Sequence, residues 1–334
     1  MLIRLLLGLA LALLLSLAGV PVARRAALAF GVVDAPDGEL KTQREPVPYL
    51  GGLAVFIAFL LALGMVIEFD VEVLGLLLAA TIAATLGLID DFGVLTPFSK
   101  VIGQVVAVFV LLKAGIMVQV VVLPLPARLI LTVVWLVGMS NAFNLTDIMD
   151  GLAGGLGVVA GIFLLAVAVL NGRWTVAAFT VVLIGALLGF LRYNFPPATI
   201  YLGDCGSLFI GLTLGALAMV MDYTRHNPLG WLAPLYFLAL PLVDTVYVSV
   251  LRARAGRKIY FGSPDHFPLR LRRRLGGSTT RTVLVTYAAA AALGGAGLAV
   301  LWLDPVETVW LTGITAVVIV AVLAWLARVP MEAK

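Results

Sequence analysis

The polar stretch NAFNLTDIMDGLAGG, residues 141–155, lies between two hydrophobic runs at 128–145 and 152–170. It carries two amides and two carboxylates at intervals of three: Asn141, Asn144, Asp147 and Asp150. Steps of three keep the first three side chains on one helix face, and a tighter terminal turn would bring the fourth into line. Because carboxylates at a membrane boundary are costly, they mark functional sites there. The alternative interpretation is a solvated acidic loop.

The rest of the chain is strongly apolar, with 62% hydrophobic and only 12% charged residues among 334. Runs of roughly 18–20 apolar residues recur along its length, and each is long enough to cross a bilayer. The connections are short, so we predict one all-α polytopic membrane domain over residues 1–334 with about eleven transmembrane helices. The runs lie near residues 2–20, 50–67, 71–89, 98–117, 128–145, 152–170, 174–191, 207–221, 229–251, 282–303 and 306–327.

The distribution of Lys and Arg predicts the orientation. Arg24 and Arg25 follow the first run, which favours a retained helix over a cleaved secretory signal. With eleven spans and the N-terminus outside, 17 of the 22 Lys and Arg residues fall on the inner side. We therefore predict a cytoplasmic C-terminus and interpret the net charge of +4 as a topology signal. We expect no nucleic-acid partner.

An acidic pair ends the third predicted span, in LGLIDD (86–91). Asp90 and Asp91 are disfavoured there by the negative end of the helix dipole and by each other, and a nearby divalent cation would offset both effects. Neighbouring helical residues point about 100° apart, so one of the two is expected to face the site. Which one is left open, and a fully solvated pair is the alternative.

Two further segments carry glycines beside polar side chains. In RYNFPPATIYLGDCGS (192–207), Gly203 and Gly206 flank Asp204, as expected where backbone approaches a ligand or metal closely. In DAPDGELKTQREPVPYLGG (34–52), Lys41 is a candidate for binding an anionic ligand, although solvation would also explain a lone lysine in a polar loop.

The segment 252–281 is predicted to be the one long cytoplasmic loop, and it carries nine basic residues. Such a loop suits lipid headgroups or phosphates, although orientation explains part of the charge. Upstream, Asp244 lies inside an apolar span and needs a partner, for which Arg252 or a neighbouring helix is a candidate.

Counting spans brings the acidic segments to one end of the predicted bundle, with Asp90, Asp91, Asp147, Asp150 and Asp204 together. Five carboxylates that close require a counter-charge. Oxygen ligands without a Cys or His cluster select a hard cation such as Mg²⁺, with Mn²⁺ as an alternative. The pattern predicts metal-assisted phosphoryl transfer at the bilayer surface. A transporter would instead place its carboxylates near the bilayer midplane.

Four ordered motifs then identify a family resemblance: PVPYLGG (46–52), LGLIDD (86–91), NAFNLTDIMDGLAGG (141–155) and YLGDCGS (201–207). Together they resemble the polyprenyl-phosphate N-acetylhexosamine-1-phosphate transferases, which are glycosyltransferase family 4 enzymes of the WecA and TagO type and, more distantly, MraY. The resemblance implies Mg²⁺-dependent transfer of a sugar-1-phosphate from a UDP-sugar to undecaprenyl phosphate, with release of UMP. It also implies an active site on the cytoplasmic face of the bacterial cytoplasmic membrane, early in cell-envelope glycan synthesis.

Carried over by position, the resemblance also implies residue roles. Asp204 is expected to be the main metal ligand, with Asp91 as a second. The expected catalytic residues are Asp90, Asp91, Asn144 and Asp147. The expected substrate-binding residues are Lys41, Asn141, Asp150, Asn194, Tyr201, His266 and Arg270. Tyr201 could offer a stacking face to uracil. Membrane lipid and a second copy of the chain are further candidate partners.

One departure bears on the sugar. The family's His-x-His-His cluster is missing, since PDHFPLRLRRR keeps only His266 and has Pro268, Arg270 and Leu271 near the expected histidines. This favours GlcNAc or another HexNAc over a MurNAc-pentapeptide donor. An MraY-like pentapeptide transferase and a non-enzymatic transporter or scaffold remain the alternatives.

Overall fold

The computed structural model describes residues 1–34, 46–119, 123–256 and 265–331. Their contacts separate two compact units, one from the described residues up to Met221 and one from Asp222 onward, and each unit is described by itself. Whether residues 1–334 act as the single membrane domain expected from the sequence stays a prediction. Lys41 lies outside the described residues.

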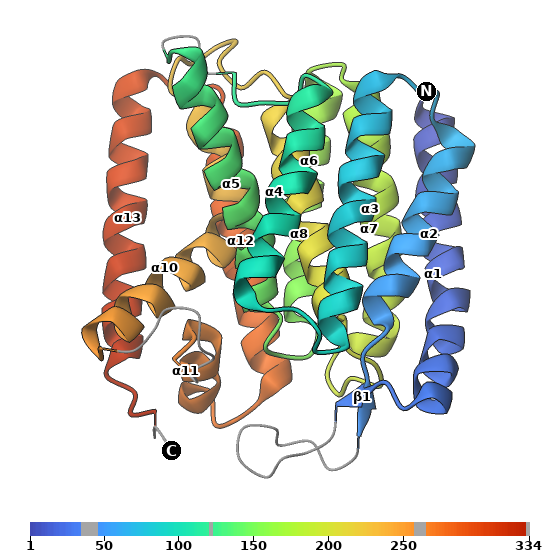
Figure 1. The fold of residues 1–334 in the computed structure, drawn as a ribbon. Coiled ribbons are helices and arrows are strands. Elements are labelled where there is room, and N and C mark those ends of the chain that lie inside the picture. Colours follow the sequence, from blue (N-terminus) through green and yellow to red (C-terminus); the bar gives the residue numbers. More distant parts are fainter. Residues whose placement is uncertain (35–45, 120–122, 257–264, 332–334) are drawn as a thin grey trace. The chain divides into compact units, whose positions relative to one another are not determined.

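The first unit holds eight helices (Figure 1): α1 (Leu2–Phe30), α2 (Gly51–Val66), α3 (Val71–Asp91), α4 (Pro97–Lys113), α5 (Leu125–Thr146), α6 (Leu152–Leu170), α7 (Trp174–Asn194) and α8 (Gly203–Met219). Two short strands, β1 (Val33–Asp34) and β2 (Val47–Pro48), pair antiparallel with Val33 opposite Pro48. This pair is a small addition to the predicted all-α fold.

Helix α8 is the central element of this unit, and Figure 1 shows it in yellow among its neighbours. Its residues from Cys205 to Ala218 are all buried, and α2, α3, α5 and α6 pack against it. Two glycines let neighbouring helices reach its first turn. A Cβ atom on Gly52 would lie 2.1 Å from the Gly206 nitrogen, and one on Gly87 would lie 2.2 Å from the Asp204 carbonyl oxygen. The start of α8 is therefore held by direct backbone approach.

The second unit holds the 3₁₀ turn η1 (Gly230–Leu232) and helices α9 (Ala233–Phe237), α10 (Ala239–Arg254), α11 (Phe267–Arg274), α12 (Thr279–Val300) and α13 (Pro305–Ala327). The span predicted over 229–251 is bent rather than continuous, because η1–α9 and α10 meet at 73°. Pro241 supplies a reason, since it has no N–H to donate to the carbonyl of Phe237. The basic segment 252–281 contains α11, so part of this predicted loop is helical.

Several helices have the length and composition of membrane spans. Among the described residues there are seven such helices, α1, α3, α5, α6, α7, α12 and α13, and eight if the bent pair counts as one span. Helices α2 and α8 are apolar but shorter. These helices are those of an integral membrane protein. The count of eleven and the predicted orientation stay predictions.

Candidate active site

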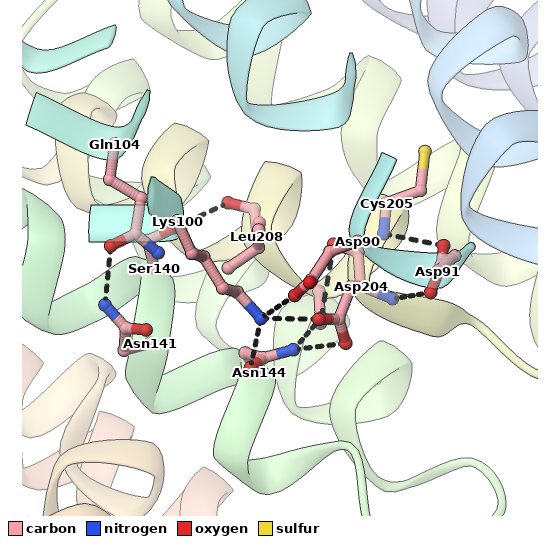
Figure 2. Close-up of polar contacts among 11 residues, drawn as sticks. Asp90, Asp91, Lys100, Gln104, Ser140, Asn141, Asn144, Asp204, Cys205 and Leu208 are labelled. Carbon is pink, nitrogen blue, oxygen red and sulfur yellow. Dashed lines mark hydrogen bonds and ion pairs between the residues drawn. The ribbon is translucent and has the colours of Figure 1, made fainter. Parts of the chain in front are cut away.

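A lysine forms the centre of the polar cluster at one end of the first unit (Figure 2). Lys100 lies in the first turn of α4, which Thr96 caps by accepting the Ser99 N–H. Its ammonium group lies 2.7 Å from an Asp90 oxygen and 2.5 Å from Asp204 Oδ2, and it donates to Asn144 Oδ1 at 3.1 Å. The side chains of Lys100 and Asp90 are only 15% and 16% exposed, so water screens this pair weakly.

Asp204 is also held by Asn144. Asn144 donates from Nδ2 to Asp204 Oδ1 at 2.7 Å and to Ser207 Oγ at 3.0 Å. Three helices that are distant in sequence, α3, α5 and α8, thus meet with α4 around one lysine. The structure therefore brings together the motifs at 86–91, 141–155 and 201–207, as the sequence predicted.

Asp91 has different partners from Asp90 (Figure 2). Its Oδ1 accepts the Asp204 backbone N–H at 2.7 Å, and its Oδ2 accepts the Cys205 N–H at 3.1 Å. A carboxylate from α3 therefore caps the N-terminus of α8, where the helix dipole favours negative charge. Gly203, with φ of +74°, leaves room for it, because a Cβ there would lie 2.8 Å from Asp91 Oδ2. Asp90 is thus the member of the pair that faces Lys100, and metal ligation by Asp91 stays a prediction.

A second layer of amides lies one helical turn from the lysine. Asn141 donates from Nδ2 to Gln104 Oε1 and to the Val137 carbonyl, both at 2.8 Å. Gln104 is 1% exposed. Since Gln104 follows Lys100 by four residues and Asn141 precedes Asn144 by three, this pair fixes the register of α4 against α5.

The turn between α5 and α6 brings Asp147 toward the same cluster. Asp147 ends α5, and its carboxyl group accepts the Gly203 N–H. Although part of the residue reaches the surface, burial of its carboxyl group raises the pKa to about 8, and the negative charges of Asp204 and Asp91 raise it further. Asp147 therefore favours its protonated form near neutral pH.

The expected nucleotide-binding residues form the frame of the loop before α8. Asn194 accepts the Gly151 N–H and donates to the Ile200 carbonyl, both at 2.9 Å, and Asp150 accepts the Ala198 N–H at 3.0 Å. The Tyr201 backbone bonds to Pro48 and Gly51, which joins the first and last motifs. Burial, followed by the charge of Asp150, raises the pKa of Tyr201 to about 12, so its phenol stays neutral. Their proposed contacts to a nucleotide stay predictions.

The second unit has its own buried polar cluster. Asp244 accepts the Phe267 N–H at 2.9 Å and contacts His266 Nδ1 at 2.6 Å, so these partners come from the segment that begins α11. Arg270 bonds to Asp265 at 2.7 Å and to the carbonyls of Ala327 and Val329 at the end of α13. These contacts tie α10, α11 and α13 together. Substrate binding by His266 and Arg270 stays a prediction.

The donor set around Lys100 has the chemistry of a hard-cation site. Within the part of the chain that the structure describes, no group of three or more His, Cys, Asp or Glu residues could hold a metal ion. Carboxylate oxygens of Asp90 and Asp204 and the amide oxygen of Asn144 nevertheless surround one positive charge, the Lys100 ammonium. Oxygen donors of this kind are the ligands that Mg²⁺ prefers, and Mg²⁺ binding here stays a prediction.

Sequence reasoning assigned no role to Lys100 or Gln104. A usable signal was present, since Lys100 follows Asp90 by ten residues on the predicted inner side. Recognising it required the knowledge that α4 returns its first turn to the end of α3.

Comparisons with known proteins give a consistent result. The family model described as glycosyl transferase family 4 matches residues 73–222, which run from α3 through α8. A probable undecaprenyl-phosphate N-acetylglucosaminyl 1-phosphate transferase of Bacillus subtilis is 32% identical over 80% of this chain and 76% of its own length. A decaprenyl-phosphate N-acetylglucosaminephosphotransferase of Mycolicibacterium smegmatis is 31% identical over 89% of this chain and 82% of its own length. A phospho-N-acetylmuramoyl-pentapeptide-transferase of Halalkalibacterium halodurans is 33% identical over 80% of this chain and 87% of its own length.

Proposed function

Because this chain belongs to glycosyl transferase family 4, as its motifs had indicated, we propose that it transfers a HexNAc-1-phosphate, GlcNAc-1-phosphate first, from a UDP-sugar to undecaprenyl phosphate. The observation that carries the proposal is the meeting of Asp90, Asn144 and Asp204 around Lys100. The names of the Bacillus and Mycolicibacterium relatives support a polyprenyl-phosphate acceptor and GlcNAc.

The reaction joins two anions, so the site must offset negative charge. An oxygen of the lipid phosphate forms a bond to the sugar-bearing phosphorus, the bond from that phosphorus to the UMP oxygen breaks, and UMP leaves with the electron pair. Bound Mg²⁺, held by Asp204 with Asn144 and Asp90, would neutralise charge on the diphosphate.

The chain's own residues position this chemistry. Lys100 supplies positive charge beside the carboxylates, and Asn144 fixes the orientation of Asp204. Asp91 orients the first turn of α8 through the Asp204 and Cys205 N–H groups. Since a phosphate monoester is already nucleophilic, positioning and charge supply most of the acceleration.

We also propose eleven spans with the site on the cytoplasmic face of a bacterial cytoplasmic membrane, as the first lipid-linked step of envelope glycan synthesis. The Lys and Arg distribution supports this orientation. A homodimer is the candidate assembly of this protein.

The test uses purified full-length protein in detergent with undecaprenyl phosphate, Mg²⁺ and a panel of UDP-sugars. We expect UMP release with UDP-GlcNAc, its loss in EDTA and its loss in Asp204→Asn, with the variant still folded by thermal unfolding. Turnover of UDP-MurNAc-pentapeptide alone would favour the activity named for the Halalkalibacterium relative. No UMP release with any donor would refute the transferase and favour a transporter or scaffold.

A further inference from the structure

A cavity lies beside the loop that precedes α8. It is a cavity of about 390 Å³ at the C-terminal end of α7, and its lining includes Arg192, Tyr193, Phe195, Pro196, Pro197 and Thr199. None of these residues takes part in the Lys100 cluster. The lining is largely apolar and aromatic, which is the composition of a site that accepts part of an amphiphile.

Close packing against α1 positions α7, whose C-terminal end contributes to the cavity. A Cβ atom on Gly185 would lie 2.5 Å from the Leu9 carbonyl oxygen, and one on Gly189 would lie 2.7 Å from the Leu13 carbonyl oxygen. Tyr193 then donates from its hydroxyl to the Leu17 carbonyl at 3.0 Å. This bond anchors the Tyr193 hydroxyl to α1.

Two arginines flank the cavity. The Arg192 guanidinium lies 5.9 Å from the centre of the Tyr193 ring, and Arg24 donates from Nε to the Thr199 carbonyl at 3.1 Å. Both arginines are exposed, and among the described residues neither forms an ion pair with a carboxylate. Arg192 thus lines the cavity and Arg24 contacts one of its lining residues, Thr199, and no carboxylate of the described residues neutralises either guanidinium group.

We propose that this cavity binds the headgroup of an anionic membrane phospholipid, with Arg192 and Arg24 on its phosphate and the aromatic and proline surface against its glycerol region. Guanidinium groups recognise phosphate through paired N–H donors. The cavity lies at the C-terminal end of α7, which like its neighbour α1 is long and apolar enough to cross a bilayer, and the ends of such helices meet the headgroup region. This site does not depend on the proposed transferase activity.

Other occupants fit the cavity less well. A free phosphate would leave the apolar lining in contact with water. A second protein chain buries roughly 800 Å² of surface on each partner, which is far more than a cavity lined by residues 191–193, 195–197 and 199 presents. The bilayer, in contrast, supplies anionic headgroups at high local concentration.

The experiment is native mass spectrometry of the full chain in detergent, titrated with phosphatidylglycerol or phosphatidylcholine. We expect phosphatidylglycerol to be retained in preference, and Arg192→Ala to weaken it by about tenfold, which is the scale of one lost charged contact. Arg192→Lys should lose less, because it keeps the charge without the paired donors. Arg173→Ala is the matched control, since Arg173 is an exposed arginine at the opposite end of α7.

Thermal unfolding confirms that each variant is folded, and Arg192→Ala alone leaves the Arg24 bond to Thr199 intact. Equal retention of both lipids, or equal losses in Arg173→Ala and Arg192→Ala, would overturn the site. Displacement of phosphatidylglycerol by inorganic phosphate or glycerol 3-phosphate at similar concentration would identify a free-phosphate site instead. Preferential displacement by undecaprenyl phosphate would reassign the cavity to the acceptor lipid.

Discussion

At the residue scale, Lys100 holds two carboxylates and one amide close together. Lys100 contacts Asp90, Asp204 and Asn144, and this gives the two carboxylates the counter-charge that their proximity demands. Asp91 has a separate role, because both of its oxygens accept backbone N–H groups of α8. The two adjacent acids therefore differ in role: Asp90 pairs with the Lys100 charge, and Asp91 caps α8.

Removing the lysine charge should make the fold dependent on a metal ion. In Lys100→Met the two carboxylates lose their counter-charge, and we expect a loss of roughly 3 kcal/mol in EDTA, as for a broken buried pair. Mg²⁺ should restore more stability to this variant than to the native protein. Thermal unfolding in EDTA and in Mg²⁺ measures the difference. Lys113→Met, at the other end of α4, is the control, and equal Mg²⁺ shifts in all three proteins would contradict the assignment.

Asp91→Asn should destabilise the protein by roughly 2 kcal/mol, because an asparagine has one acceptor oxygen for two N–H groups. Denaturant or thermal unfolding gives the comparison. Among the described residues, Asp70 accepts one backbone N–H, that of Val73 at 2.8 Å, and asparagine caps equally well, so Asp70→Asn should change little. Similar effects for the two variants would show that Asp91 is not the cap of α8.

The raised pKa of Asp147 predicts a pH dependence of stability. Its pKa is about 8 in the folded protein against 3.8 ordinarily, so the folded state retains a proton that the unfolded state releases. This stabilisation is complete below pH 4 and is lost as the pH rises through 8. In EDTA, the melting temperature should therefore fall from pH 5 to pH 9, and Asp147→Asn should flatten that slope. An unchanged slope would disprove the assignment.

At the element scale, the first turn of α8 is positioned by glycines on other helices. Gly52 of α2 and Gly87 of α3 meet its backbone directly, so any side chain there would move Asp204 relative to Lys100. The lack of side chains at these glycines therefore sets the distance between the charged groups of Asp204 and Lys100.

Gly52→Ala should cost roughly 1–3 kcal/mol, as overpacking does, because its Cβ would lie 2.1 Å from the Gly206 nitrogen. Gly64 lies in the same helix and has nothing within 4 Å of its Cβ position, so Gly64→Ala should be neutral or slightly stabilising. Thermal unfolding of the two single variants tests this contrast. Equal tolerance would mean that α2 does not hold the start of α8.

At the scale of the whole molecule, orientation in the membrane can be tested with the native chain as background. The single Cys205 is fully buried, so it should not react with an impermeant thiol reagent. Arg173 and Arg192 are exposed at opposite ends of α7. We expect Arg173→Cys to be labelled in intact cells and Arg192→Cys only after permeabilisation. The reverse pattern would invert the proposed orientation.

Local chemistry explains which features could be predicted from the sequence. Hydrophobic runs, the polar interruptions between them and the ordered motifs are properties of consecutive residues, and they indicated a helical membrane protein of this family and the acids that meet. The bend at 229–251 was missed because Pro241 lies inside an otherwise continuous apolar run.

The hydrogen-bond and ion-pair partners of each acidic residue could not be predicted from the sequence. Whether Asp90 or Asp91 faces Lys100 depends on the rotation of α3, and one residue changes that direction by about 100°. The amide of Asn194 and the carboxylate of Asp150 bond to backbone groups that only loop packing brings near. Residue order thus accounts for the kind of protein and its polar motifs, whereas the packing of helices around α8 assigns each polar group its partner, because hydrogen bonds depend on distances that sequence separation does not contain.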